Sequence, residues 1–152
     1  MNNGKPIQDL WPANTCYGCG PDNPQGMHIK SYWSEDGKYL IANYIPEKKY
    51  NAGFPNIMYG GTVASLIDCH SIWTAIAFTY KEQGVPLRDT LEIAYMTGKL
   101  SVHFIKPTPL DREIKLRSWT SGPIGRKVHV ICELGHDNEI TATGEVIAVR
   151  TN

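Results

Sequence analysis

The sequence has no excess of charge of either sign. Its 152 residues include 15 Lys and Arg against 15 Asp and Glu, so the formal net charge is zero. Proteins that bind nucleic acid or an anionic membrane through electrostatics carry a basic excess. The balance therefore predicts neither a nucleic-acid partner nor a membrane partner. The length is that of one domain with a substantial core.

The N-terminal residues also lack an apolar run. MNNGKPIQDLW contains no continuous hydrophobic segment of the kind that a secretory signal requires. We therefore expect no secretory signal and a cytoplasmic location. The chain shows no internal repeat and no low-complexity segment.

Cysteine is scarce, with four residues in the whole chain. Cys16 and Cys19 form the only CxxC pair, whereas Cys69 and Cys132 lie far along the chain in apolar stretches. A structural zinc site usually takes two such pairs, and with His28 as a third ligand a fourth is still missing. No βαβ pattern follows the pair, as thioredoxin-like chemistry would require. We interpret the pair as reduced thiols in a tight glycine-rich turn and predict no metal, with zinc binding or redox chemistry as the alternatives.

Most of the chain has the alternation of β-strands. Residues 27–33 and 39–45 flank the turn SEDGK, in which Asp-Gly favours a hairpin. Period-two alternation in the second half predicts a half-exposed antiparallel sheet. The strands predicted there are 99–107, 112–120, 127–134 and 139–150. We expect residues 1–27 to form an irregular segment with the CxxC turn, and residues 28–152 to form one domain.

The segment from Met58 to Tyr80, MYGGTVASLIDCHSIWTAIAFTY, is the most apolar part of the chain. Its apolar residues recur at spacings of three and four, which predicts a helix buried nearly all round. Asp68, His70 and several hydroxyl groups argue against a membrane span of similar length. One buried helix and about six antiparallel strands predict an α+β fold in which the sheet wraps round the helix.

Two features of this helix suggest chemistry. The N–H groups of Gly60, Gly61 and Thr62, at its start, should lack intrahelical acceptors and can stabilise a negative oxygen. Asp68 is the only formally charged residue of the segment, and burial should raise its pKa. Such a carboxylate is a candidate general base or nucleophile. The structural alternatives are glycines that merely admit the chain to a crowded helix start, and an acid held by hydrogen bonds in the core.

The glycine pair and Asp68 are too far apart along the helix to serve one substrate within a single chain. Gly60 and Asp68 are eight residues apart, which is about 12 Å along a helix. One substrate carbonyl cannot contact both in one chain, but two antiparallel helices related by a two-fold axis would bring them together. We therefore expect a homodimer, or a dimer of dimers. His70 is two residues from Asp68 and points elsewhere, so we interpret it as a hydrogen-bonded core or interface histidine, with a direct role as the alternative.

Several segments resemble the phenylacetate-degradation type of acyl-CoA thioesterases, which have the hotdog fold. CYGCGPDNPQGMHIK resembles their N-terminal signature, and YGGTVASLID resembles their His-Gly-Gly motif with an acid seven residues later. TGKLSVHFIKPTPL resembles their strand that opens with a hydroxyl residue and ends in a Lys-Pro-x-Pro turn, and GRKVHV fits the next strand. The resemblance covers residues 16–150 and implies an antiparallel sheet wrapped around one long helix.

The resemblance also implies roles for individual residues in the hydrolysis of an acyl-CoA thioester, without a metal or organic cofactor. Gly60 would polarise the thioester carbonyl, and Asp68 would act as base or nucleophile on the substrate of the other subunit. Thr97 would position the water or the acid. Asn51, or as a weaker match Asn56, would supply a helping amide.

Other residues are candidates for substrate binding. Gly61 and Tyr59 flank the carbonyl site, and Tyr59 stands where the family most often has histidine. A phenol still donates a hydrogen bond near pH 7, and the glycine backbone is expected to be the main electrophile, so activity should survive the exchange. Arg126 and Lys127 would meet the phosphates of coenzyme A, unless they only form a solvated turn.

Aromatic and aliphatic residues near the helix are candidates for an acyl pocket. Trp73, Phe54 and Ile57 would line it, with burial in the core as the alternative. Two other functions stay open within the same fold. The exchange at Tyr59 favours a protein that binds an acyl thioester without hydrolysing it, and a dehydratase or hydratase would need an acid–base pair, for which only Asp68 and His70 are available.

Overall fold

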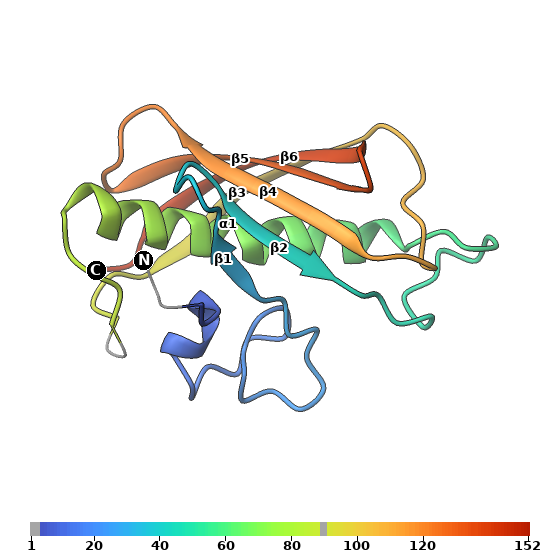
Figure 1. Ribbon diagram of the computed structural model, residues 1–152, viewed down its shortest axis with the longest axis horizontal. Coiled ribbons are helices and arrows are strands. Elements are labelled where there is room, and N and C mark those ends of the chain that lie inside the picture. The colour runs from blue at the N-terminus through green and yellow to red at the C-terminus, as the bar shows by residue number, and fades with distance from the viewer. Residues whose placement is uncertain (1–3, 89–90) are drawn as a thin grey trace.

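The computed structural model describes residues 4–88 and 91–152 as one helix packed on one sheet (Figure 1). The long helix α1 spans Gly60–Glu82, and a short 3-10 helix, η1, precedes the sheet. Helix η1 spans Ile7–Leu10. The strands are β1 (Ser31–Trp33), β2 (Leu40–Tyr44), β3 (Tyr95–Phe104), β4 (Ile114–Ser121), β5 (Lys127–His136) and β6 (Glu139–Arg150).

The six strands form one sheet in the order β1-β2-β4-β5-β6-β3, and every neighbouring pair is antiparallel. The predicted hairpin is confirmed, with Gly37 at φ 67° in its turn. With α1 lying along one face of the sheet, the expected α+β hotdog architecture is confirmed. The predicted boundary between residues 1–27 and 28–152 stays a prediction.

The start of β3 differs from the prediction. The strand begins at Tyr95, four residues before the predicted Lys99, and its pairing with β6 shifts between Thr97 and Lys99. This irregularity leaves Gly98 unpaired and interrupts the alternation, as a β-bulge does. Sequence periodicity is lost at such a point, so only the regular part of the strand was predicted.

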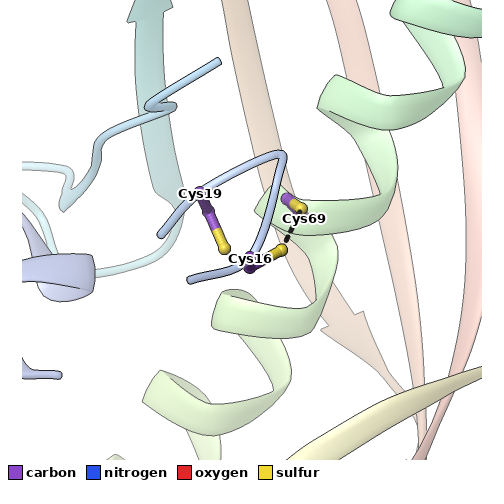
Figure 2. A group of neighbouring side chains, drawn as sticks. All are labelled: Cys16, Cys19 and Cys69. Carbon is purple, nitrogen blue, oxygen red and sulfur yellow. Dashed lines mark hydrogen bonds between the residues drawn. The ribbon is translucent and has the colours of Figure 1, made fainter. Parts of the chain in front are cut away.

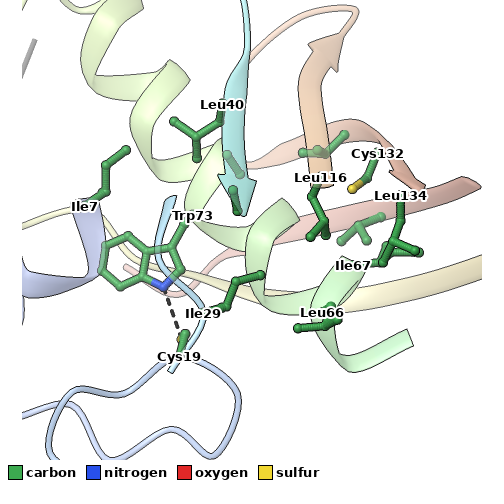
Figure 3. Packing of buried hydrophobic residues seen from close by; sticks show 14 of the residues in the cluster. Ile7, Cys19, Ile29, Leu40, Leu66, Ile67, Trp73, Leu116, Cys132 and Leu134 are labelled. Carbon is green, nitrogen blue, oxygen red and sulfur yellow. Dashed lines mark hydrogen bonds between the residues drawn. The ribbon is translucent and has the colours of Figure 1, made fainter. Parts of the chain in front are cut away.

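Helix α1 is enclosed along most of its length. No residue from Gly60 to Tyr80 is exposed, which confirms the predicted burial. Ile67 lies beside Leu134 of the sheet, and Leu66 and Leu116 are buried in the same core (Figure 3). Each such side chain, fully buried, contributes roughly 1.5–3 kcal/mol to stability. Among the described residues, no helix combines the length and the apolarity needed to cross a bilayer.

The N-terminal segment covers another side of the helix. Ile7, Cys19 and Ile29 are buried in the same core as the residues of α1 and the sheet (Figure 3). The indole N–H of Trp73 donates a hydrogen bond to Cys19 Sγ at 3.2 Å. The segment is therefore part of the core, although η1 is the only helix among residues 4–30 and β1 follows them.

Strand β3 forms an edge of the sheet, and its apolar face is uncovered. Leu100 pairs with Val146 and Phe104 with Ala142, and both partners are buried. Since paired residues share a face of an antiparallel sheet, Leu100 and Phe104 lie on the side that carries α1. Nevertheless Phe104 is 53% exposed and Leu100 36%. The predicted apolar face exists, but this chain alone does not cover it.

Close packing of α1 on β6 depends on Gly144, and substitution there tests the helix–sheet contact. A Cβ at Gly144 would lie 2.3 Å from Cγ2 of Ile67, a stiff β-branched side chain. We expect Gly144→Ala to lower the free energy of unfolding by about 1–3 kcal/mol through overpacking. Denaturant unfolding measures the change. The control is Gly125→Ala, where an added Cβ meets nothing within 4 Å; equal stability of the two variants would contradict this packing.

Candidate active site

The carboxylate of Asp68, on α1, is held by a hydroxyl from β3. Thr97 Oγ1 donates a hydrogen bond to Asp68 Oδ1 at 2.5 Å. Burial raises the pKa of Asp68, the hydrogen bond from Thr97 opposes that rise, and a nearby negative charge on Cys16 adds to it. Asp68 Oδ2 has no hydrogen-bond partner within residues 4–88 and 91–152. One oxygen is thus anchored while the other can accept a proton.

The start of α1 presents two unused donors. Across the described part of the chain, the N–H groups of Gly60 and Gly61 have no acceptor. The prediction that the N–H of Thr62 is also unused was wrong. Thr62 N donates a hydrogen bond to the carbonyl of Tyr59 at 3.0 Å in a tight first turn. Two adjacent amides at a helix N-terminus can bind a negative or strongly polarised oxygen.

Tyr59 lies beside this start and leaves it accessible. Its side chain is 59% exposed, and its ring packs against Gly61, where an added Cβ would lie 2.4 Å from Cε1. Tyr59 is the N-cap residue of α1 but makes no side-chain capping bond. The ring therefore flanks the amides without using them.

An open apolar depression of about 430 Å³ adjoins Gly60. Two of the three residues predicted for an acyl pocket, Phe54 and Ile57, line it. Trp73 is 2% exposed and lies in the core, which is the alternative that the sequence left open for it. The other lining residues are Ala52, Met58, Gly60, Val63, Phe104, Ile105, Lys106, Pro107 and Thr108.

Asn51 and Asn56 lie in the loop that precedes α1 and stabilise its turns. Asn51 Oδ1 accepts a hydrogen bond from Gly53 N at 3.0 Å. Asn56, with φ at 56°, accepts one from Leu110 N at 3.0 Å. Both are exposed near the helix start, and neither forms a hydrogen bond with Asp68 of the same chain.

His70 is a hydrogen-bonded core residue, as the main interpretation of the sequence had it, and the alternative of a direct role in substrate binding is wrong. Its ring is 0% exposed, with Nδ1 2.8 Å from Ser31 Oγ and Nε2 3.1 Å from the Leu40 carbonyl. Burial lowers the pKa of His70 to about 4, so the ring is neutral near pH 7. Gln8 completes the network by donating to Ser31 Oγ at 2.8 Å and accepting from its N–H. With both ring nitrogens engaged, His70 cannot also contact a ligand.

Arg126 and Lys127 lie at the other end of the molecule. The adjoining carbonyl of Gly125 accepts a hydrogen bond from Tyr95 Oη, which is 3.1 Å from Thr79 Oγ1 near the end of α1. Thr79 is about 28 Å from Gly60 along the helix. Both basic residues are exposed. Within one chain, they are not part of the site at Gly60.

The CxxC pair has a neighbour that sequence reasoning missed. Cys16 Sγ is 3.8 Å from Sγ of Cys69, the helix residue next to Asp68. A hydrogen bond from Cys69 lowers the pKa of Cys16 to about 5, whereas the pKa of Cys69 is raised. His28, the possible third ligand in the zinc alternative, instead directs Nε2 at the Asn23 carbonyl, 2.5 Å away. The separation of 53 residues gave no signal for this contact.

Solved structures with a similar fold include several thioesterases. A thioesterase superfamily protein from Shewanella loihica PV-4 is 31% identical, with a TM-score of 0.65 over 82% of this chain and 91% of that chain. A phenylacetic acid degradation-related protein from Ralstonia eutropha JMP134 is 17% identical, with a TM-score of 0.63 over 81% and 85%. A Bacillus halodurans protein solved with CoA is 20% identical, with a TM-score of 0.63 over 83% and 76%. No protein-family model and no curated protein sequence matches the chain.

Proposed function

The chain belongs to the hotdog-fold thioesterase superfamily, and we propose that it hydrolyses an acyl-CoA thioester at a site shared by two subunits. The observation that carries the proposal is the half-buried Asp68, anchored by Thr97, on the same helix as the unused amides of Gly60 and Gly61. The CoA bound to the Bacillus halodurans protein supports coenzyme A as the leaving group.

The helix geometry supports a shared site. Helix α1 is continuous from Gly60 through Asp68, so the two lie about 12 Å apart along it. A carbonyl oxygen bound at Gly60 is therefore out of reach of Asp68 in the same chain. In an antiparallel pair of helices, Asp68 of one subunit would face the amides of the other, and the pair would form two equivalent sites.

One face of α1 is suited to such a partner. The half-buried positions of the helix include a stripe at spacings of three and four, formed by Gly61, Ala64, Ser65, Asp68 and Ile72. Three of these side chains are small and would let a second helix approach closely. The uncovered apolar residues of β3 extend the same surface, and an edge strand can pair with a second copy. A two-fold axis that exchanges positions 60 and 68 passes beside residue 64, which is alanine.

The proposed reaction uses few groups. The amides at the helix start polarise the thioester carbonyl of the bound substrate. Asp68 of the other subunit accepts a proton from water as the water oxygen bonds to the carbonyl carbon, with Thr97 fixing the direction of the carboxylate. The carbon–sulfur bond then breaks, and the thiolate of coenzyme A leaves and takes up a proton. If Asp68 acts instead as the nucleophile, its carboxylate attacks the carbonyl carbon and the thiolate of coenzyme A leaves. Water then hydrolyses the acyl-aspartyl intermediate.

The other candidate residues would bind parts of the substrate that do not react. The depression beside Gly60 would receive the start of the acyl chain, with Phe54 and Ile57 in its wall. In the antiparallel pair, the end of one subunit that carries Arg126 and Lys127 would lie toward the helix start of the other, where phosphates of coenzyme A need cations. Asn51 and Asn56 would border the entrance from the loop.

Tyr59 favours a second candidate function. Its exposed ring packs on Gly61 at the position that would meet the thioester. If the ring narrows the space for attacking water, the protein would bind an acyl thioester without hydrolysing it. A screen of short, aromatic and long acyl-CoAs with a thiol-reactive dye distinguishes the two functions. Turnover supports the hydrolase, and tight binding without turnover of any substrate supports the binding protein.

Asp68→Asn tests the base. The amide keeps the size of the side chain but cannot accept the proton, so we expect kcat to fall by about 10²- to 10⁴-fold. The melting temperature should stay close to that of the parent, because the side chain is only half-buried. The best substrate of the screen gives the rate. Hydrolysis at the parental rate in a folded variant would remove Asp68 from the mechanism.

Thr97 is expected to act through Asp68, as a positioning residue. Thr97→Val keeps the shape but removes the hydroxyl, and a lost hydrogen bond to a charged group should lower kcat about 10- to 100-fold with KM little changed. Thr97→Ser keeps the donor and should restore most of the rate. A valine variant as fast as the serine variant would show that the hydrogen bond plays no part.

Ala64→Glu tests the shared site. Near a two-fold axis the substitution would place two like charges close together, so we expect a monomer by light scattering, with kcat/KM reduced at least about 100-fold. Circular dichroism should show the parental helix content, since glutamate is a good helix former. Glu82→Lys, at the exposed end of α1, is the control and should leave both assembly and rate unchanged. A monomeric Ala64→Glu protein with full activity would contradict a site formed by two subunits.

A further inference from the structure

Three thiols from distant parts of the sequence converge beside the helix. Cys16 and Cys19 come from the N-terminal turn and Cys69 from α1, and their sulfur atoms all lie within 4.8 Å of one another (Figure 2). All three are free cysteines. The reaction proposed above uses none of them.

The turn is shaped around this cluster. Gly18 lies against Cys69, and a Cβ at Gly18 would come within 2.3 Å of Cys69 Sγ. A Cβ at Gly20 would lie 2.4 Å from the Asn14 carbonyl oxygen and the Cys16 nitrogen. Two glycines thus allow the CxxCG turn to fold tightly and to receive the helix sulfur.

Hydrogen-bond donors also surround the sulfurs. Trp73 Nε1 donates to Cys19 Sγ at 3.2 Å. The backbone N–H groups of Gly18 and Cys19, in the same turn, help to lower the pKa of the Cys16 thiol. Donors directed at cysteine sulfur stabilise thiolates, which are better acceptors than thiols and are the form that ligates metals.

One of the sulfur–sulfur separations equals that expected in a thiolate–metal site. Two thiolates on a tetrahedral zinc ion, each with a Zn–S bond of about 2.3 Å, lie about 3.8 Å apart. Cys16 and Cys69 Sγ are 3.8 Å apart. We propose that Cys16, Cys19 and Cys69 bind one thiophilic divalent cation, Zn²⁺ being the best fit, and so join the N-terminal segment to α1.

The chemistry of the donors selects the class of metal. Three soft sulfurs favour Zn²⁺ over the hard cations Mg²⁺ and Ca²⁺, which take oxygen ligands. A zinc site with three protein ligands completes its coordination with water or another exogenous group. A Cys16–Cys69 disulfide is the rival outcome; it requires the two sulfurs to close to about 2.05 Å and an oxidant such as a peroxide.

Metal titration of the full chain tests the site. Reduced protein, freed of metal by a chelator, is titrated with Zn²⁺ against a chromophoric competitor, and with Co²⁺ to record thiolate-to-cobalt charge-transfer bands. We expect one Zn²⁺ per chain and tetrahedral Co²⁺ spectra, with Mg²⁺ failing to compete. Cys16→Ser should weaken Zn²⁺ binding at least about 100-fold, more than the loss of an outer-shell partner does. Cys132→Ala is the control, because Cys132 lies in the core outside the cluster, and should bind as the parent does.

A second variant leaves every sulfur in place. Gly18→Ala puts a methyl group where Cys69 Sγ lies, so it should weaken Zn²⁺ binding while α1 and the sheet keep their circular dichroism. Binding of less than one equivalent by the fully reduced parent, or equal affinity in the parent, Cys16→Ser and Gly18→Ala, would overturn the proposal. A Cys16–Cys69 disulfide that forms in the presence of Zn²⁺ would overturn it as well. Because the readout is metal binding, its result is independent of thioester turnover.

Discussion

The packing of α1 against one face of the sheet is the contact on which the rest of the molecule depends. The sheet covers one side of the helix and the N-terminal segment covers another, and the stripe that contains Ala64 and Asp68 is left partly open. A carboxylate on that stripe is desolvated enough for its pKa to rise, yet it stays accessible. Both the chemistry of Asp68 and the surface for a second subunit therefore follow from how the helix is enclosed.

Local patterns were enough to predict most of this fold. The apolar spacing of three and four identified α1, and β6 spans the predicted residues 139–150. These segments are regular, so the burial of each side chain repeats with the period of the backbone. The glycine pair and Asp68 were found in the same way, since both are unusual within an apolar helix. The hydroxyl of Thr97 was identified by family resemblance, because the bulge at Gly98 disrupts the pattern around it.

Contacts between distant segments were beyond such reasoning. The network that holds His70 joins η1, β1 and β2, and none of its members signals the others in the sequence. The sequence indicated a hydrogen-bonded core histidine but not which residues would be its partners. The same holds for Cys69, which appeared as an isolated apolar cysteine until the fold placed it against the CxxC turn. A side chain whose role depends on tertiary partners acquires that role only in the folded chain.

Adjacent residues of α1 connect the two sites. Successive side chains on a helix point about 100° apart, so Asp68 meets β3 while Cys69 meets the N-terminal turn. Residues 11–30, between η1 and β1, form no helix or strand, and their position relies on turns and a few buried side chains. Metal ligation gives such a short, irregular segment the stability that a sheet supplies elsewhere. A cation held by Cys69 would therefore fix the surroundings of Asp68 without taking part in the reaction itself.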